Sequence, residues 1–335
     1  MAEDVTLIRP RELADEELPP LVSMRNVTKL FGDVTALRKI TLDVPRGGIF
    51  GFIGPSGCGK TTTVRVLIGN YKASAGEISV LGKSPEAFTA NDQRRIGYMP
   101  QLFILYPELT VWENLNFAAS IYGYPLNRKE RLHQLLDLVE LTGHEKKLVR
   151  NISGGMQRRL SLASTLVHDP ELIFLDEPTS GIDPVLRRKF WDHFRFLRDR
   201  GHTLFVTTQY VGEAAYCDYV GVMRDGELLT VETPDMLRYK ALGGQVVDLR
   251  TIAPFTLEQL VQLEDHPRIN GEITFLDVLT ARFTVDEASK AIPQLLEWCR
   301  AQDIAVESIN EYVPPFDDVF VMLMEQERER RELAQ

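Results

Sequence analysis

A glycine-rich stretch between a buried strand and a helix limits most strongly how this chain can fold. Ile49–Ile53 is a short apolar run typical of a buried strand, and Thr61–Ile68 has helical spacing. The stretch between them matches G-x-x-x-x-G-K-[ST]; its residues, with the next threonine, are Gly54, Pro55, Ser56, Gly57, Cys58, Gly59, Lys60, Thr61 and Thr62. A glycine-rich turn without function is disfavoured, because strand, lysine, threonine and helix are all in place.

This stretch predicts a phosphate site. Its glycines let backbone N–H groups turn inward around phosphates, and the following helix adds the positive end of its dipole. We expect Lys60 to reach the β- and γ-phosphates and Thr61 to ligate Mg²⁺.

An acidic pair, Asp176 and Glu177, follows the apolar run Leu172–Leu175. Alone, such a pair is more often a solvated turn. Beside a phosphate loop, an aspartate at the carboxyl end of a buried strand can hold Mg²⁺. The glutamate is then placed to polarise the attacking water as a general base.

The remaining pattern predicts an α/β fold. Polar and apolar residues alternate over Val22–Val44, as they do in strands. Residues 111–168 are mainly helical and include an amphipathic helix at Arg128–Leu141. Farther along the chain, the amphipathic segment Phe190–Arg200 precedes another buried strand, Thr203–Thr207. Strands alternating with helices favour a parallel sheet covered on both faces. After Gly243 and Gly244, short strands (Val246–Leu249, Arg282–Val285) and a helix (Glu287–Trp298) indicate a small α+β domain, and Glu325–Arg331 reads as a solvated helix end.

Composition excludes several classes of protein. A net charge of −10 over 335 residues argues against nucleic-acid binding and against adhesion to an anionic bilayer. The three cysteines, Cys58, Cys217 and Cys299, are too widely spaced for a metal site or a disulfide framework, which favours a reducing compartment. The N-terminus does not resemble a signal peptide, and no apolar run reaches the ~18–20 residues of a membrane span. Any role at a membrane is therefore expected to depend on a partner.

Between the two motifs, Ile152–Leu160 resembles the L-S-G-G-Q signature of ATP-binding cassette (ABC) proteins, with isoleucine for leucine and methionine at the fifth place. The resemblance implies a P-loop NTPase cassette: a RecA-like core, an antiparallel β subdomain and a helical subdomain. In that family the signature of one subunit covers the ATP held by the other, so two cassettes enclose two ATP molecules. The signature residues that would act on the second subunit's ATP are Ser153, Gly154, Gly155 and Met156.

Other family landmarks occur in order along the chain. By resemblance, Gln101 senses the metal and the attacking water, Phe31 stacks on adenine, and Asp183 communicates across the dimer. For Phe31 a purely structural role is the alternative. The family normally has histidine where this chain has Gln209, which can donate an amide hydrogen bond to the γ-phosphate but cannot carry a proton. Some drug-resistance exporters carry glutamine there, so we do not interpret it as inactivation; Glu177 remains the obvious base.

The resemblance also suggests how the chain is divided. We expect an N-terminal arm at 1–20, an ABC domain at 21–242 with its helical subdomain at about 102–168, and an accessory α+β domain at 243–335. Tyr312–Phe320 resembles the C-terminal segment P-x-L-E-D-V-F of cassettes that export drugs, lipids or polysaccharides, although an amphipathic helix closing the small domain is the alternative.

These features predict an ATPase that drives export. Its cofactors would be ATP and Mg²⁺, and its partners a second cassette (the same chain or a paralogue) and separately encoded transmembrane permease subunits. We expect it on the cytoplasmic face of the membrane, with the region after Gln101, including Leu102–Trp112, as the docking surface.

Three other functions stay open from sequence alone. An importer ATPase with a regulatory C-terminal domain is disfavoured by Pro315–Phe320. A soluble cassette ATPase of DNA repair or translation is disfavoured by the single cassette, the acidic charge and the lack of sustained heptads. A plain P-loop kinase or GTPase would leave Ser153–Gly155 unexplained. The transported substrate cannot be read from this chain.

Overall fold

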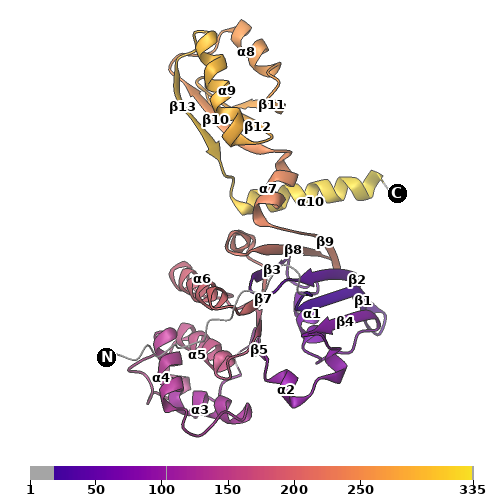
Figure 1. The fold of residues 1–335 in the computed structure, drawn as a ribbon, viewed down its shortest axis with the longest axis vertical. Helices are drawn as coiled ribbons and strands as arrows, with labels where there is room; N and C mark the ends of the chain where they lie inside the picture. Colours follow the sequence, from indigo (N-terminus) through magenta and orange to yellow (C-terminus); the bar gives the residue numbers. More distant parts are fainter. Residues whose placement is uncertain (1–18, 103, 334–335) are drawn as a thin grey trace. The chain divides into compact units, whose positions relative to one another are not determined.

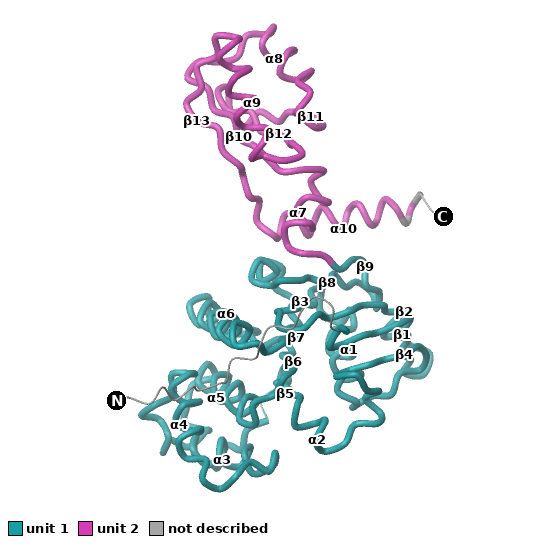
Figure 2. Tube along the Cα trace, in the orientation of Figure 1, with its two compact units in different colours: residues 1–231 teal, residues 232–335 magenta. Residues whose placement is uncertain are grey.

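The computed structural model describes residues 19–102 and 104–333, so most of the predicted arm at 1–20 lies outside the described residues. The described chain divides into two compact units, residues 1–231 and 232–335 (Figure 2). This division comes before helix α7 (Pro234–Leu242), whereas the sequence interpretation placed a domain boundary after it. Within the second unit α7 packs on α10 (Phe316–Leu333), and the Gln326 amide donates to the Ala241 carbonyl at 2.9 Å.

The first unit is built on a sheet whose strand order is β5-β6-β7-β3-β8-β9. Neighbours from β5 to β8 pair in parallel. The strands are β5 (Ile96–Met99), β6 (Leu172–Asp176), β7 (Thr203–Thr208), β3 (Ile49–Ile53), β8 (Tyr219–Arg224) and β9 (Glu227–Glu232). Because β3 lies between β7 and β8, and β6 lies beyond β7, the carboxyl ends of β3, β6 and β7 share one edge.

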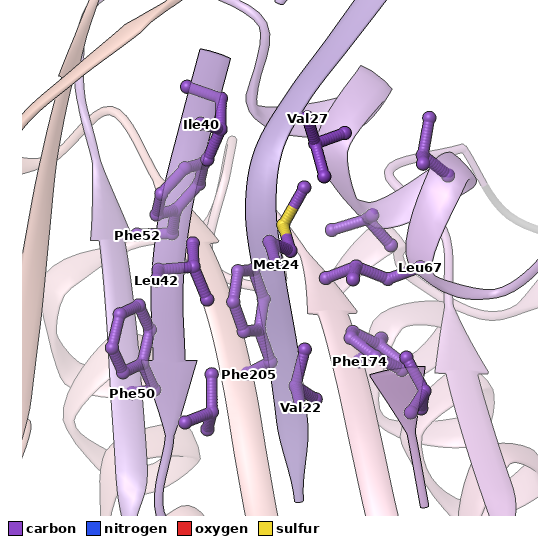
Figure 3. Close-up of a cluster of buried hydrophobic side chains, with 14 of the residues drawn as sticks. Val22, Met24, Val27, Ile40, Leu42, Phe50, Phe52, Leu67, Phe174 and Phe205 are labelled. Atoms are coloured by element: carbon purple, nitrogen blue, oxygen red, sulfur yellow. The ribbon is translucent and has the colours of Figure 1, made fainter. Parts of the chain in front are cut away.

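One face of this sheet packs on α1 (Lys60–Leu67) and on an antiparallel sheet of order β2-β1-β4. Those strands are β1 (Val22–Phe31), β2 (Val34–Val44) and β4 (Ala75–Val80). Figure 3 shows the core between the two sheets, where Val22, Met24, Ile40 and Leu42 face Phe50, Phe52, Phe174 and Phe205. The alternation of β1 and β2 therefore buries one side of each strand, as an antiparallel pair over a core requires.

The opposite face is covered by α6 (Pro184–Asp199), which lies across the sheet from α1 in Figure 1. Its amphipathic pattern buries Phe190, Trp191, Phe194 and Leu197. The prediction of a parallel sheet covered on both faces is confirmed. Short elements complete the connections: α2 (Ala90–Gln93) and the 3₁₀ turns Pro85–Ala87, Val149–Asn151 and Val211–Tyr216.

A helical region follows Gln101 and contains α3 (Val111–Ile121), α4 (Lys129–Leu138) and α5 (Gly154–Leu166). Leu132, Leu135 and Leu136 of α4 are buried, as their spacing predicted. Residues 104–110 are not helical, and the first helix begins at Val111, where the sequence predicted the mainly helical stretch to start. Pro107 interrupts the segment, and Thr110 with Glu113 forms a capping box that starts the helix at Val111.

The second unit has the element order β-α-β-β-α-β between α7 and α10. Its elements are β10 (Gln245–Thr251), α8 (Leu257–Glu264), β11 (Asn270–Phe275), β12 (Thr280–Val285), α9 (Ala288–Ala301) and β13 (Val306–Tyr312). The strand order β11-β12-β10-β13 with antiparallel pairs is the ferredoxin-like arrangement. Ala291, Leu295 and Cys299 of α9 pack on Val247 and Phe283 of the sheet.

Among the described residues, none of the helices combines the length and the apolar character needed to cross a membrane.

Candidate functional site

The glycine-rich loop connects β3 to α1 and requires glycine for steric reasons. Gly59 has φ +112°, and a Cβ there would lie 2.8 Å from the Ala36 carbonyl oxygen. A Cβ on Gly54 would lie 2.2 Å from the Met223 carbonyl oxygen. The backbone can therefore take this path only without side chains at these positions.

Lys60 is the first residue of α1, and its side chain folds back over the loop. Its Nζ donates to the carbonyl oxygens of Gly54 at 2.8 Å and Pro55 at 3.0 Å. The ammonium group is buried, so it supplies a positive charge in a place where water screens it weakly. Burial raises the pKa of the neighbouring Cys58 thiol, and the Lys60 charge opposes that rise, so the thiol stays neutral near pH 7.

Asp176 ends β6 and faces the start of α1. Its Oδ1 accepts hydrogen bonds from the hydroxyls of Thr61 at 3.0 Å and Thr207 at 2.6 Å. Its Oδ2 is buried and has no hydrogen-bond partner within the part of the chain that the structure describes. A buried carboxylate oxygen beside a threonine hydroxyl is a donor set that suits a hard cation such as Mg²⁺.

Glu177 contacts three other residues through its carboxylate and its backbone N–H. One carboxylate oxygen lies 3.5 Å from Lys60 Nζ, and the other accepts a hydrogen bond of 3.1 Å from the Gln101 amide. Its backbone N–H donates to the Thr207 hydroxyl at 3.0 Å. With φ +48° Glu177 occupies the left-handed region, which is strained for a non-glycine residue and recurs at functional sites.

Gln209 and Phe31 lie at the ends of strands. Gln209 is exposed and follows Thr208, which pairs with Ile53 at the start of the loop and accepts from the Gly54 N–H at 3.4 Å. Phe31 ends β1 with a half-exposed ring whose centroid is 5.2 Å from that of Tyr71, edge to face. Lys29 Nζ lies 4.8 Å from the Phe31 ring centroid. An exposed aromatic ring of this kind can stack on a base.

The signature residues belong to a different part of the first unit. Ser153 caps α5 by accepting from the Met156 N–H, and Asp183 caps α6 by accepting from Val185 and Leu186. The hydrogen bonds from the backbone N–H groups of Leu186 and then Val185 lower the pKa of Asp183, so its carboxylate stays ionised near neutral pH. An open hollow of about 450 Å³ lies beside these two caps. The described residues that line it are Glu140, Ser153, Gly155, Met156, Arg159, Asp183, Val185, Leu186 and Lys189.

The predicted site residues therefore form two groups. The structure brings Lys60, Thr61, Gln101, Asp176 and Glu177 into one network of contacts. Ser153, Gly155, Met156 and Asp183 line the separate hollow, which has no phosphate-loop residue in its described lining. The two groups therefore lie in separate places within the described part of the first unit.

Sequence reasoning missed two residues of the first group. The Thr207 hydroxyl joins Asp176 to the backbone of Glu177, and Arg158 donates to the backbone of the loop that carries Gln101. A threonine at the end of a buried strand was the available signal for Thr207, whereas nothing in the sequence singles out Arg158.

Several known proteins resemble this chain in sequence or in fold. The ABC transporter family profile matches residues 37–180. Nod factor export ATP-binding protein I of Burkholderia lata is 35% identical over 257 residues, which cover 76% of this chain and 84% of that protein. Linearmycin resistance ATP-binding protein LnrL of Bacillus subtilis is 31% identical over 305 residues, which cover 90% of this chain and 98% of that protein.

Another relative is longer. The probable multidrug ABC transporter ATP-binding protein YbhF of Escherichia coli is 36% identical over 229 residues, which cover 68% of this chain, and the chain spans only 40% of its length. Among solved structures, the ATP-binding cassette MJ0796 in a dimeric post-hydrolysis state bound to ADP and Pi is 26% identical, with a TM-score of 0.58 over 63% of this chain and 98% of that one. Because two relatives above 30% identity are matched over most of their length, this chain belongs to the ABC transporter family, among its ATP-binding proteins.

Proposed function

We propose that this chain is the ATP-hydrolysing motor subunit of an ABC export transporter. The observation that carries the proposal is the single network in which Lys60, Thr61, Gln101, Asp176 and Glu177 meet. The names of the relatives, which refer to export and resistance, support export over import. What is exported is a property of the membrane partner and is not specified by these residues.

The contacts assign a role to each group. Thr61, Asp176 and Gln101 would hold Mg²⁺, which when bound neutralises charge on the phosphate oxygens. Lys60 and the loop N–H groups bind the phosphates, and Thr62 extends the helix N-terminus toward them. Glu177 accepts the proton of the attacking water, with its carboxylate oriented by Gln101 and Lys60. Phe31 stacks on adenine.

A second cassette would complete each site. Ser153, Gly154, Gly155 and Met156 of one copy would close over the ATP held by the phosphate loop of the other, with Asp183 beside the contact. The dimeric state of the related cassette MJ0796 supports this arrangement. The partner is a second copy of this chain or a paralogue, and closure would drive the membrane subunits from the cytoplasmic face.

The surface for those membrane subunits is proposed to be the loop after Gln101. Ile104 is 71% exposed, which is unusual for isoleucine. We expect Ile104→Asp to abolish co-purification with membrane proteins of the source organism from a detergent extract, because a carboxylate cannot be desolvated cheaply in an apolar contact. ATP affinity should stay within about threefold of the parent, since the phosphate loop is not altered.

The matched control for this test is Leu257→Asp on α8, at an apolar residue that is 84% exposed in the second unit. It should leave co-purification unchanged. Equal recovery of membrane partners with Ile104→Asp and with the parent would exclude this surface.

Replacing Gln209 with histidine tests its role. If Gln209 only donates a hydrogen bond to the γ-phosphate, Gln209→His should preserve or raise the hydrolysis rate. The variant should also gain a dependence on pH near the ordinary imidazole pKa of about 6.5, which a glutamine cannot give. Phosphate release measured across that pH range checks both effects, and complete loss of activity would contradict the assigned contact.

A further inference from the structure

Arg158 is a charged residue in an unusual place. It lies on α5, five residues after Ser153, and its side chain is only 4% exposed. Burial lowers the pKa of its guanidinium, and the nearby negative charge of Glu177 opposes that effect. Because burying a guanidinium is costly unless its hydrogen bonds are satisfied, the groups that surround it are informative.

Its two terminal nitrogens bind two different loops. Nη1 donates to the Gln101 carbonyl at 2.8 Å, and Nη2 donates to the Ser180 carbonyl at 3.1 Å. The first loop follows β5 and the second follows β6, so one side chain of α5 joins segments that come from two strands of the sheet.

Both of these loops control the position of Glu177. The Gln101 side chain donates to its carboxylate at 3.1 Å, and the Ser180 N–H donates to its carbonyl at 3.2 Å. Asp183, which caps α6, follows in the same loop as Ser180. A shift of either carbonyl would therefore move the carboxylate that faces Lys60.

We propose that Arg158 is a positioning residue that couples the signature turn at Ser153 to the carboxylate of Glu177. The coupling rests on the proposed ATPase function. Helix α5 begins at the signature turn, so a displacement of that turn by the nucleotide of a second cassette is carried along a rigid helix to Arg158. The planar guanidinium holds two acceptors in a fixed geometry, and an ammonium group cannot reproduce this. Engagement of the signature thus sets the base in position.

The simpler alternative is that Arg158 only stabilises the fold. The experiment must distinguish this structural role from the coupling role. In the full-length chain, Arg158→Met removes both hydrogen bonds at similar length, and Arg158→Lys keeps the charge but lacks the fork. The matched control is Arg131→Met: Arg131 of α4 is 11% exposed and donates to the Leu166 carbonyl at 3.0 Å, away from the site. All variants are compared by melting temperature, ATP affinity and kcat.

Coupling predicts a split between binding and turnover. Arg158→Met should lower kcat roughly 10–100-fold with ATP affinity within about threefold of the parent, because a misplaced base costs rate rather than binding. Arg158→Lys should fall between Arg158→Met and the parent, and it carries the test if Arg158→Met does not fold. Arg131→Met should lower the melting temperature about as much as Arg158→Met does, while its kcat stays within about twofold of the parent's.

Two results would overturn the coupling: Arg158 variants with the parent's kcat, or a loss of kcat in Arg131→Met as large as in Arg158→Met. A parent chain that does not hydrolyse ATP would instead overturn the proposed function, and the coupling with it.

Discussion

Glu177→Gln is expected to lower ATP hydrolysis by roughly 10²–10⁴-fold while leaving ATP bound. Glutamine has nearly the same shape as glutamate, so the contact with Gln101 can persist, but an amide cannot accept the proton of the attacking water. Binding survives because the phosphates are held by Lys60 and the loop rather than by Glu177. The variant should therefore accumulate an ATP-bound dimer, visible by size-exclusion chromatography in the presence of ATP.

A carboxylate near the other end of the same strand provides the control. Glu171 precedes β6 and forms ion pairs with Arg46 at 2.7 Å and Arg95 at 2.6 Å. Glu171→Gln should reduce stability slightly and leave hydrolysis within about twofold, since partly exposed ion pairs contribute little. Hydrolysis by Glu177→Gln at the rate of the parent would show that another group is the base.

The parts of the fold that the sequence predicted are those where one short segment decides the outcome. The run Ile49–Ile53 is fully buried as β3, and Leu172–Leu175 lies within β6, because both are apolar throughout and stop at polar or glycine residues. The loop from Gly54 to Thr61 could also be predicted, because its conformation depends on residues close to it in the sequence. Each of its constraints is local, as the 2.2 Å approach at Gly54 illustrates.

Elements whose pattern is weak were not predicted. β5 has only four residues, and the strands β9 and β11 are largely polar or partly exposed along their length. Such strands are stabilised by their neighbours in the sheet rather than by their own sequence, so tertiary context decides them. The ferredoxin-like order of the second unit depends on β11, so the sequence predicted that unit only as α+β.

The candidate site shows the same limit. The sequence supplied Asp176 and Glu177 as a pair, but not the contact of both with Thr207, which exists because β7 pairs with β6 in a register that sets Asp176 opposite Thr207. Strand order and register are long-range properties. Arg158 escaped notice because its two acceptors are backbone carbonyls, which carry no sequence signal.

Asp176→Asn should lower kcat by about 10²-fold or more and raise the Mg²⁺ concentration that gives half-maximal hydrolysis. Asparagine keeps a carbonyl oxygen where Oδ1 accepts from Thr61 and Thr207, so the fold around the site should survive. It places an amide nitrogen where Oδ2 now lies without a hydrogen-bond partner in the described chain, and an amide NH₂ cannot ligate a cation. Several kcal/mol of charge stabilisation on the phosphates would be lost, which corresponds to that change in rate. A Mg²⁺ titration of phosphate release measures both effects.

Asp218→Asn separates loss of the metal ligand from general damage to the sheet. Asp218 Oδ2 accepts from the Ile49 N–H at 2.7 Å, at the other end of β3, and Oδ1 pairs with Arg198 at 2.9 Å. That variant should melt at a lower temperature with an unchanged Mg²⁺ dependence. If Asp176→Asn also kept the Mg²⁺ dependence of the parent, the buried Oδ2 would not be a ligand of the cation. The cation would then have to be held by Thr61 and Gln101 without a carboxylate, which is too weak a donor set for Mg²⁺, since its sites normally use one or two carboxylates besides phosphate oxygens.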